Sequence, residues 1–136
     1  MSKLKIINKH VERYKNHKLK SPGKAWPFDV RDALICINNH LYDANYSVKT
    51  MRELCNLSDT NFSSRFRHYV GMTPREYITF HRVQSGMMLF RNKKLKHVRV
   101  SEIGFIVGYE NPSSFTMTFK RYTGLSPKEW KRVQMQ

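Results

Sequence analysis

Apolar residues recur at intervals of three and four positions along most of the chain, which is the spacing of one face of an α-helix. After Pro27 this spacing predicts consecutive helices that end near residues 43, 55, 70 and 91, with short turns between them. Before Pro27 only residues 4–14 carry the same spacing, through Leu4, Ile7, Val11 and Tyr14. We therefore expect an all-α protein.

Residues that cap helices stand where these helices should begin and end. Ser47 and Ser58 can accept hydrogen bonds from the first free backbone amides of the helices that follow them. Gly71 suits the left-handed conformation in which many helices end. The tetrapeptide 73–76, Thr-Pro-Arg-Glu, then supplies a cap, a proline at the first helical position and the glutamate of a capping box. These signals predict a long helix from about 74 to 91.

The pattern from residue 62 onward occurs a second time. Phe62, Phe66, Tyr69, Gly71, Pro74 and Glu76 recur 53 positions later as Phe115, Phe119, Tyr122, Gly124, Pro127 and Glu129. Upstream the offset is 52, which pairs Met51 with Ile103 and Leu57 with Tyr109, so the turn of the second copy is one residue longer. So many matches, with the caps kept, indicate an internal duplication of one small helical unit.

Each copy consists of a short helix, a tight turn and a second helix that ends at glycine, which is the plan of a helix-turn-helix. In such units the second helix lies in the major groove of DNA. We predict base contacts from the outward-facing residues Thr60, Asn61, Ser63, Ser64 and Arg67 of the first copy and Asn111, Ser113, Ser114, Thr116, Met117 and Lys120 of the second. The alternative, ordinary amphipathic helices facing water, accounts less well for two copies in tandem.

Composition adds a strong charge imbalance to this picture. The 136 residues are 40% hydrophobic and 26% charged, as in globular proteins, and 25 Lys and Arg stand against 10 Asp and Glu, a net charge of +15. Such an excess indicates a polyanionic partner, with nucleic acid as the first candidate and an anionic membrane surface as the second. The apolar runs are too short for a membrane span, and residues 1–10 do not resemble a secretory signal.

The two cysteines, Cys36 and Cys55, stand among apolar residues at helical spacing and form no C-x-x-C pair. We expect them to be buried free thiols rather than a disulfide. Free thiols indicate a reducing compartment, and we therefore expect a cytoplasmic protein.

The run 101–109, Ser-Glu-Ile-Gly-Phe-Ile-Val-Gly-Tyr, is followed by Ser114-Phe115, by Phe-Lys-Arg-Tyr at 119–122, and by Gly124 and Pro127. The long helix adds Tyr77, Arg82, Gly86, Leu89 and Phe90 to this combination. Together these residues make the segment 28–134 resemble the DNA-binding domain of the AraC/XylS family of bacterial transcription regulators. The resemblance implies about seven helices, arranged as two helix-turn-helix subdomains joined by a long linker helix. The corresponding segments are a basic arm or linker at 1–26, the subdomains at 27–72 and 93–136, and the linker helix at 73–92.

The same resemblance carries functional expectations. Two recognition helices about one DNA turn (~34 Å) apart would let a monomer read an extended site on double-stranded DNA. Members regulate transcription, most often as activators that contact RNA polymerase. They usually carry a separate sensor domain before the reader, and residues 1–26 are too short for one, so the chain resembles either a small stand-alone member or an excised reader domain.

Three positions depart from the family pattern. Arg52 and Gly104 stand where each first helix usually has alanine, and we expect Arg52 to be displaced outward. Gly86 replaces an alanine in the linker helix, which should lower helix stability by about 0.5–1 kcal/mol. The predicted recognition residues are mostly Ser, Thr and Asn, so few can make bidentate base contacts. We therefore expect more of the specificity from bridging water and DNA shape.

A second set of residues is predicted to contact the DNA backbone. It comprises Ser47, Arg82, Lys94, Lys96, Ser101 and Arg121. Ser47 and Ser101 stand at predicted helix starts, where backbone amides bind phosphate. Lys94 and Lys96 belong to the basic loop 92–99, which we expect between the subdomains, where the DNA backbone would pass.

Other classes of function fit less well. The six histidines are scattered and no metal-binding, nucleophilic or Gly-rich phosphate motif occurs, so we expect no enzyme, catalytic residue, metal or cofactor. A protein of cationic membrane surfaces would need a Lys-rich amphipathic helix, which only residues 4–14 approach. Duplex RNA has a major groove too narrow for side chains to read. A surface- or RNA-binding helical protein is the alternative to sequence-specific binding of DNA.

Overall fold

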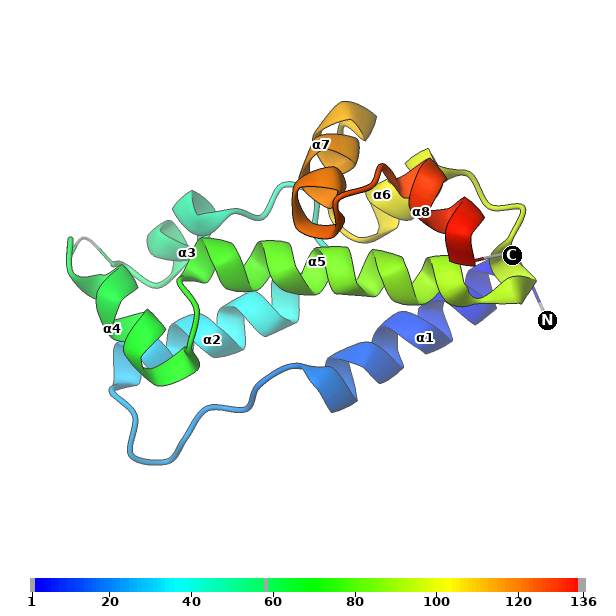
Figure 1. The fold of residues 1–136 in the computed structure, drawn as a ribbon. Helices are drawn as coiled ribbons and strands as arrows, with labels where there is room; N and C mark the ends of the chain where they lie inside the picture. The colour runs from blue at the N-terminus through cyan, green and yellow to red at the C-terminus, as the bar shows by residue number, and fades with distance from the viewer. Residues whose placement is uncertain (1, 58, 135–136) are drawn as a thin grey trace.

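The computed structural model describes residues 2–57 and 59–134. In this part of the chain the fold is entirely helical, as predicted, with eight α-helices and one short 3₁₀ helix (Figure 1). The elements are α1 (Lys3–Lys18), α2 (Phe28–His40), α3 (Val48–Leu54), α4 (Phe62–Val70), α5 (Pro74–Arg91), η1 (Lys93–Leu95), α6 (Val100–Ile106), α7 (Pro112–Thr123) and α8 (Pro127–Gln134). The helix beyond the expected seven is α1.

The long helix α5 runs through the middle of the molecule and is shared by two helical units (Figure 1). The first unit, α2 to α4, packs on the amino-terminal half of α5, which contributes Tyr77 and Ile78 to its core. The second unit, α6 to α8, packs on the carboxyl-terminal half, which contributes Val83, Leu89 and Phe90. Because one continuous helix supplies side chains to both cores, it fixes the orientation of the two units.

The sequence repeat corresponds to a repeat in the structure. The four matched phenylalanines, Phe62, Phe66, Phe115 and Phe119, are fully buried. Gly71 and Gly124 end α4 and α7 in the left-handed conformation, with φ of 96° and 84°. The side chains of Thr73 and Ser126 then cap α5 and α8, since each accepts a hydrogen bond at 3.2 Å from the backbone amide three residues later.

The tight turns of the two units are equivalent in conformation but differ in residue type. Asn56 has a φ of 53°, and Gly108, which stands 52 positions later, has a φ of 114°. A Cβ atom on Gly108 would lie 2.6 Å from Nε of Arg82. The second turn therefore requires glycine for space as well as for its positive φ.

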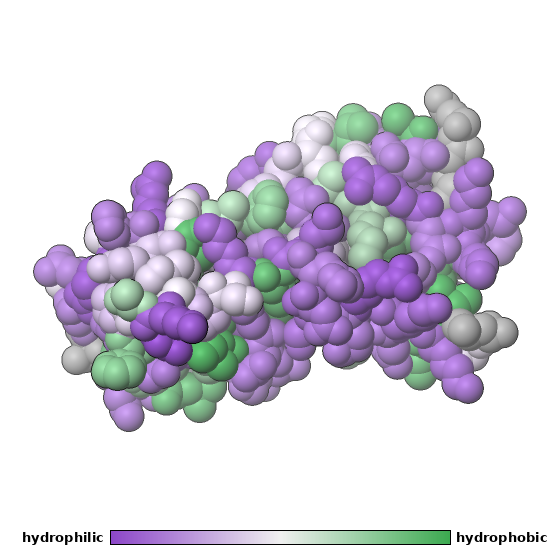
Figure 2. All heavy atoms as spheres, turned by 90° about the horizontal axis from the view of Figure 1, so that it is seen from below, coloured by the Kyte–Doolittle hydropathy of each residue, from purple (hydrophilic) through white to green (hydrophobic). Residues whose placement is uncertain are grey.

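The amino-terminal segment, expected as a basic arm or linker with a helix over 4–14, contains a longer helix that packs on the second unit. Ile7 and Val11 of α1 belong to the core that includes Val83 and Leu89 of α5. The remaining face of α1 carries most of the segment's basic residues, and the half of the molecule over α1 is mostly hydrophilic when seen from below (Figure 2). Residues 3–18 are thus part of the folded body rather than a free arm.

Both cysteines are free thiols, as predicted, but they are half-buried rather than fully buried. The hydroxyl of Tyr46 donates a hydrogen bond to Sγ of Cys36 at 3.1 Å. Burial raises the pKa of the Cys55 thiol to about 11, which keeps this thiol protonated and unreactive near neutral pH.

Candidate nucleic-acid interface

The second helix of the first unit, α4, begins later than predicted. It starts at Phe62 after the cap Asn61, whose side chain makes no capping hydrogen bond, while the predicted cap Ser58 lies outside the described residues. The carboxamide of Asn61 is therefore available to a partner. Of the residues predicted to contact bases, Thr60, Asn61, Ser64 and Arg67 are exposed and Ser63 is half-buried.

Arg52 connects the two helices of the first unit. Its guanidinium lies over the ring of Phe62, 5.6 Å from the centroid, and donates hydrogen bonds to Oγ of Ser63 at 3.1 Å and to the carbonyl of Asp59 at 3.2 Å. The side chain is thus half-buried against α4 rather than displaced outward as predicted. The ring and the two oxygen acceptors explain how an arginine is accommodated where a small residue was expected.

The carboxylate of Asp59, beside the start of α4, is engaged within the protein. It accepts hydrogen bonds from the backbone amide of Asn61 at 2.7 Å and from Nη1 of Arg65 at 2.6 Å. The amide of Asn61, followed by Arg65, lowers the pKa of Asp59. Arg65 also forms an ion pair with Asp29 of α2. These contacts offset the negative charge of Asp59, the acid nearest to the residues of α4 that were predicted to contact DNA.

In the second unit, α7 presents its predicted residues at one exposed end and along one side. Asn111 caps α7 with its side-chain oxygen, which accepts a hydrogen bond from the amide of Ser113 at 2.8 Å, so its amide group still points outward from the cap as a donor. Asn111, Ser113, Ser114, Met117 and Lys120 are exposed, and Thr116 is half-buried. Met117 is 63% exposed, which leaves its side chain available for apolar contact.

Gly104 allows α7 to lie close to α6. A Cβ atom at this position would stand 2.7 Å from Cδ2 and 2.8 Å from Cγ of Phe115, the first buried phenylalanine of α7. Glycine therefore replaces the alanine of the family pattern because the ring of Phe115 occupies the space of the methyl group.

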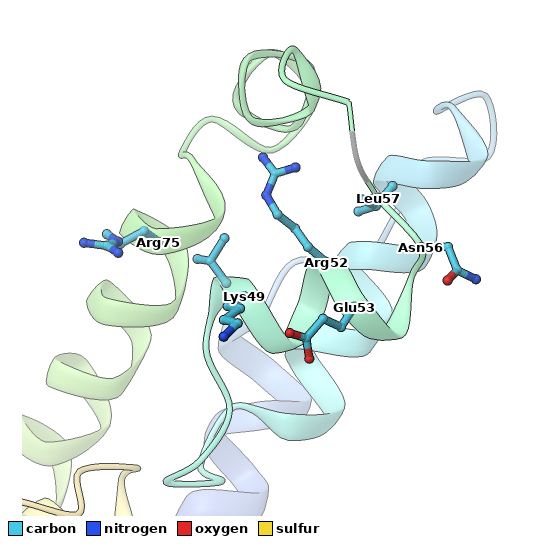
Figure 3. A pocket seen from close by; sticks show the side chains of 7 residues that line it. Lys49, Arg52, Glu53, Asn56, Leu57 and Arg75 are labelled. Carbon is cyan, nitrogen blue, oxygen red and sulfur yellow. The ribbon is translucent and has the colours of Figure 1, made fainter.

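Two adjoining hollows connect the recognition helices of the two units. The first, of about 680 Å³, is bordered by Lys49 and Arg52 of α3 and by Arg75 of α5 (Figure 3). The second, of about 370 Å³, is lined by Lys49 and Arg75 again and by Thr118 and Arg121 of α7. The two hollows share Lys49 and Arg75, and α7 lines the second one. Arg52 links the first hollow to Ser63 of α4. Glu53 is the one acid among the described lining residues of the two hollows, so this side of the molecule is mainly basic.

Lys49 and Arg75 are basic residues of this side that the sequence reasoning did not select. Both are exposed and lie in the first turn of a helix that follows a capping residue, Ser47 or Thr73. A basic residue within two positions of a predicted cap, in the same unit as a recognition helix, was the signal that could have identified them.

Arg82, which was predicted to contact the DNA backbone, is engaged mainly within the protein. The side chain is 7% exposed, and its guanidinium donates to three backbone carbonyls: Nε to Leu41 at 2.7 Å, and Nη2 to Asp43 at 2.9 Å and to Tyr46 at 3.1 Å. Burial lowers the pKa of this guanidinium from its ordinary high value. Arg82 lines the second hollow, but its Nε and Nη2 are committed to these carbonyls, so we assign it a structural role.

The other residues predicted to contact the backbone are exposed, but their settings differ. Oγ of Ser47 caps α3 by accepting from the amide of Thr50 at 3.3 Å. Ser101 lies in the first turn of α6, whose cap is Arg99 rather than Ser101 itself. Arg121 of α7 lines the second hollow and faces the basic side directly.

The loop 92–99 does not lie between the two units as expected. It follows the carboxyl end of α5, on the side of the molecule farthest from α4 (Figure 1), and Asn92 forms a hydrogen bond with His10 of α1 at 2.8 Å. Leu95 and Val98 anchor the loop in the core of the second unit, while Lys94 and Lys96 are exposed. These lysines can meet only DNA that extends past the second unit.

The described residues contain no group of three or more His, Cys, Asp or Glu side chains arranged to hold a metal ion. None of the described helices combines the length and apolar character that crossing a membrane requires.

Known proteins share this arrangement. A family model described as a helix-turn-helix domain matches residues 51–133. An uncharacterized HTH-type transcriptional regulator of Haemophilus influenzae is 30% identical over 88 residues, 65% of this chain and 28% of the relative. The arabinose operon regulatory protein of Escherichia coli is 26% identical over 102 residues, 75% of this chain and 34% of that protein. The chain thus spans about a third of the length of these relatives.

Among solved structures, the C-terminal domain of AraT, a response regulator from Geobacillus stearothermophilus, superimposes with a TM-score of 0.68 at 23% sequence identity. The superposition covers 81% of this chain and 88% of that domain. This likeness supports the fold of two helical units on a shared helix.

Proposed function

The chain belongs to the helix-turn-helix family of AraC-type transcriptional regulators, and on that premise we propose that it binds double-stranded DNA with α4 and α7 in successive major-groove segments. The observation that carries the proposal is that two adjoining, mainly basic hollows share Lys49 and Arg75, with α7 lining one of them and α4 joined to the other through Arg52. A single chain then presents two equivalent readers at an orientation held by α5.

Specific residues divide between reading bases and positioning the protein. Asn61 is the best candidate for a bidentate contact with adenine, since its carboxamide makes no capping hydrogen bond at the exposed start of α4. The side-chain oxygen of Asn111 caps α7, so Asn111 offers its side-chain amide group as a single donor. Lys49, Arg75 and Arg121 line the hollows between the units and are placed to hold phosphates. The remaining exposed recognition residues are short, so bridging water and DNA shape supply the rest of the specificity.

As a regulator the protein acts on transcription in the bacterial cytoplasm, as an activator that contacts RNA polymerase, and it reads its site as a monomer. Support for the monomer comes from the duplication, because two readers in one chain make a second copy unnecessary for an extended site. Support for activation comes from the family, in which that role is common.

The test is selection of bound fragments from a random pool of double-stranded DNA, followed by affinity measurements at several salt concentrations. We expect an extended, non-palindromic site with two sequence blocks about ten base pairs apart. Contact with six to ten phosphates should weaken binding about 10³–10⁵-fold between 50 and 200 mM salt. A palindromic site or a shallow salt dependence would contradict the proposal.

The same measurements on duplex RNA and on anionic vesicles address the alternative of a cationic surface- or RNA-binding protein. We expect both to bind at least tenfold more weakly than the selected DNA at equal salt, since specific complexes exceed non-specific ones by about 10³ or more. Equal affinity for all three polyanions would favour the alternative.

A further inference from the structure

α1 and α5 enclose a groove that the proposed DNA contacts do not use. Its volume is about 640 Å³, within the range of pockets that take small ligands. Its lining residues are Arg13, Tyr14, His17, Lys18, Phe80, His81, Gln84, Met88 and Arg91. A smaller hollow of about 360 Å³ shares Lys18, Phe80 and His81 with it and extends the space toward α4.

The lining of the groove is cationic at its rim and apolar at its base. Arg13 and Lys18 of α1 and Arg91 of α5 supply the positive charges, and no Asp or Glu lines the space. Among the described residues none of these three cations forms an ion pair. Half-buried Phe80 and Met88 supply the apolar surface. The guanidinium of Arg91 lies over the ring of Trp130, 5.2 Å from its centroid. The groove therefore offers the positive charges of Arg13 and Lys18, unpaired among the described residues, beside apolar area.

A buried histidine gives the groove one polar atom at depth. His81 is 7% exposed, and its Nδ1 forms a 2.7 Å hydrogen bond with the hydroxyl of Tyr14. Nε2 of His81 forms no hydrogen bond with the described residues. Since no fully buried polar side-chain atom among the described residues lacks a partner, Nε2 is in contact with the surface, where His81 lines the groove and the smaller hollow. When the hydroxyl of Tyr14 donates to Nδ1, Nε2 carries the proton and can donate to a ligand oxygen.

The groove lies on the side of α5 opposite to the basic hollows. The hollows use positions 75, 78, 79 and 82 of α5, whereas the groove uses 80, 84, 88 and 91. At 3.6 residues per turn these two sets point in opposite directions from the helix axis. DNA held against α4 and α7 therefore leaves the groove open.

We propose that the groove between α1 and α5 binds a small organic anion, with its acidic group at the cations of the rim and its apolar body on Phe80 and Met88. The charges select a carboxylate or sulfonate rather than a neutral molecule, because a hydrogen bond between ionised groups is about twice as strong as one between neutral groups. The volume suits a body of one or two rings or a short alkyl chain.

The experiment uses 1-anilinonaphthalene-8-sulfonate as the probe and measures its fluorescence with the full chain. The neutral N-phenyl-1-naphthylamine, which has the same rings without the sulfonate, is the ligand control. The test variant is Arg13→Ala with Lys18→Ala, and the matched control is Lys5→Ala with Lys9→Ala, which removes the same charge from exposed positions of α1 outside the groove. Imidazole proton shifts in NMR spectra, assigned by the signal missing in His81→Gln, locate the bound probe.

We expect the sulfonate probe to bind at one site per chain and to shift the His81 signal. Its affinity should fall at least tenfold in the test variant and change less than twofold in the matched control. The neutral probe should bind at least tenfold more weakly than the sulfonate. Equal losses in both double variants, equal binding of both probes, or an unmoved His81 signal would each overturn the proposal. Formation of a dimer that excludes the probe would assign the groove to a second copy of the chain and would also overturn it.

Discussion

The guanidinium of Arg82 lies over the ring of Tyr109, with 5.6 Å between its carbon and the ring centroid. Arg82 belongs to the shared helix α5 and Tyr109 to the turn of the second unit. The same guanidinium donates to the carbonyls of Leu41, Asp43 and Tyr46, which follow α2 of the first unit. One side chain of the linker helix thus contacts both units at their junction, where it also lines the second basic hollow.

Arg82→Ala should lower the free energy of unfolding by at least about 2 kcal/mol, because a buried acceptor left without a donor costs about 1–3 kcal/mol. Urea unfolding followed by circular dichroism measures this loss. Arg75→Ala is the matched control on the same helix, since Arg75 is exposed, and it should change stability by less than about 0.5 kcal/mol. Equal effects of the two substitutions would show that the carbonyls do not depend on Arg82.

Two glycines that face Phe115 should respond in opposite ways to alanine. A Cβ atom on Gly104 would stand 2.7 Å from the ring of Phe115, so Gly104→Ala should destabilise the protein by roughly 1–3 kcal/mol through overpacking. A Cβ atom on Gly86 would stand at 3.4 Å, an ordinary contact, so Gly86→Ala should stabilise α5 by about 0.5–1 kcal/mol. Thermal unfolding of both variants checks the sign, and stabilisation by Gly104→Ala would contradict the close packing of α6 on α7.

The stability of the protein should fall as the pH drops from about 6.5 to about 4. Burial lowers the pKa of His81 to about 4, from 6.5 for an exposed histidine. Within this interval the unfolded chain binds a proton that the folded chain does not, so the free energy of unfolding decreases with falling pH, by up to about 3 kcal/mol in total. Urea unfolding at pH 7, 5.5 and 4.5 measures the slope.

His81→Gln should reduce this pH dependence, because it removes the histidine whose pKa burial lowers to about 4, while the lowered pKa of His10 remains. His97→Gln, a substitution at an exposed histidine, should retain the slope of the unsubstituted protein. An unchanged slope in His81→Gln would assign the pH dependence to other groups.

Substitutions in α4 should separate base reading from phosphate contact. Asn61→Ala should relax the preference at one position of the DNA site, at about 1–3 kcal/mol, because the carboxamide of Asn61 is uncommitted within the protein. Arg67→Ala should weaken binding to all sequences alike, because an exposed arginine acts on the backbone charge. Binding assays against a set of single-base variants distinguish the two, and identical profiles would contradict this division of roles.

Much of the fold was predictable because its signals are local. Gly71 and Gly124 end their helices, and Thr73 and Ser126 cap the next ones, through contacts that span no more than four residues. The matched phenylalanines stand at helical spacing in both copies of the repeat, and all four are fully buried. The exposed recognition residues followed from the same periodicity, since the outer face of a helix is set once its inner face is known.

Other features were mispredicted because distant segments decide them. Arg52 was expected to turn outward, but Ser63, eleven residues later, and the ring of Phe62 hold it against α4. Residues 3–18 were expected in an arm, but α5 offers an apolar face that Ile7 and Val11 cover. An amphipathic helix with a high positive charge has the same sequence pattern whether or not a partner helix is available.

The amino-acid sequence alone determined two similar helical units and the helix that joins them. Helical spacing, capping residues and the internal repeat were sufficient, because these signals act over one or two helical turns. Only the folded chain decided which basic side chains are available to an anion. Arg82 and Arg75 are both arginines on α5. Backbone carbonyls of residues 36 to 41 positions away in the sequence bind the guanidinium of Arg82, whereas Arg75 is exposed. Burial of a charge depends on such long-range partners, and the spacing of residues along one helix does not predict them.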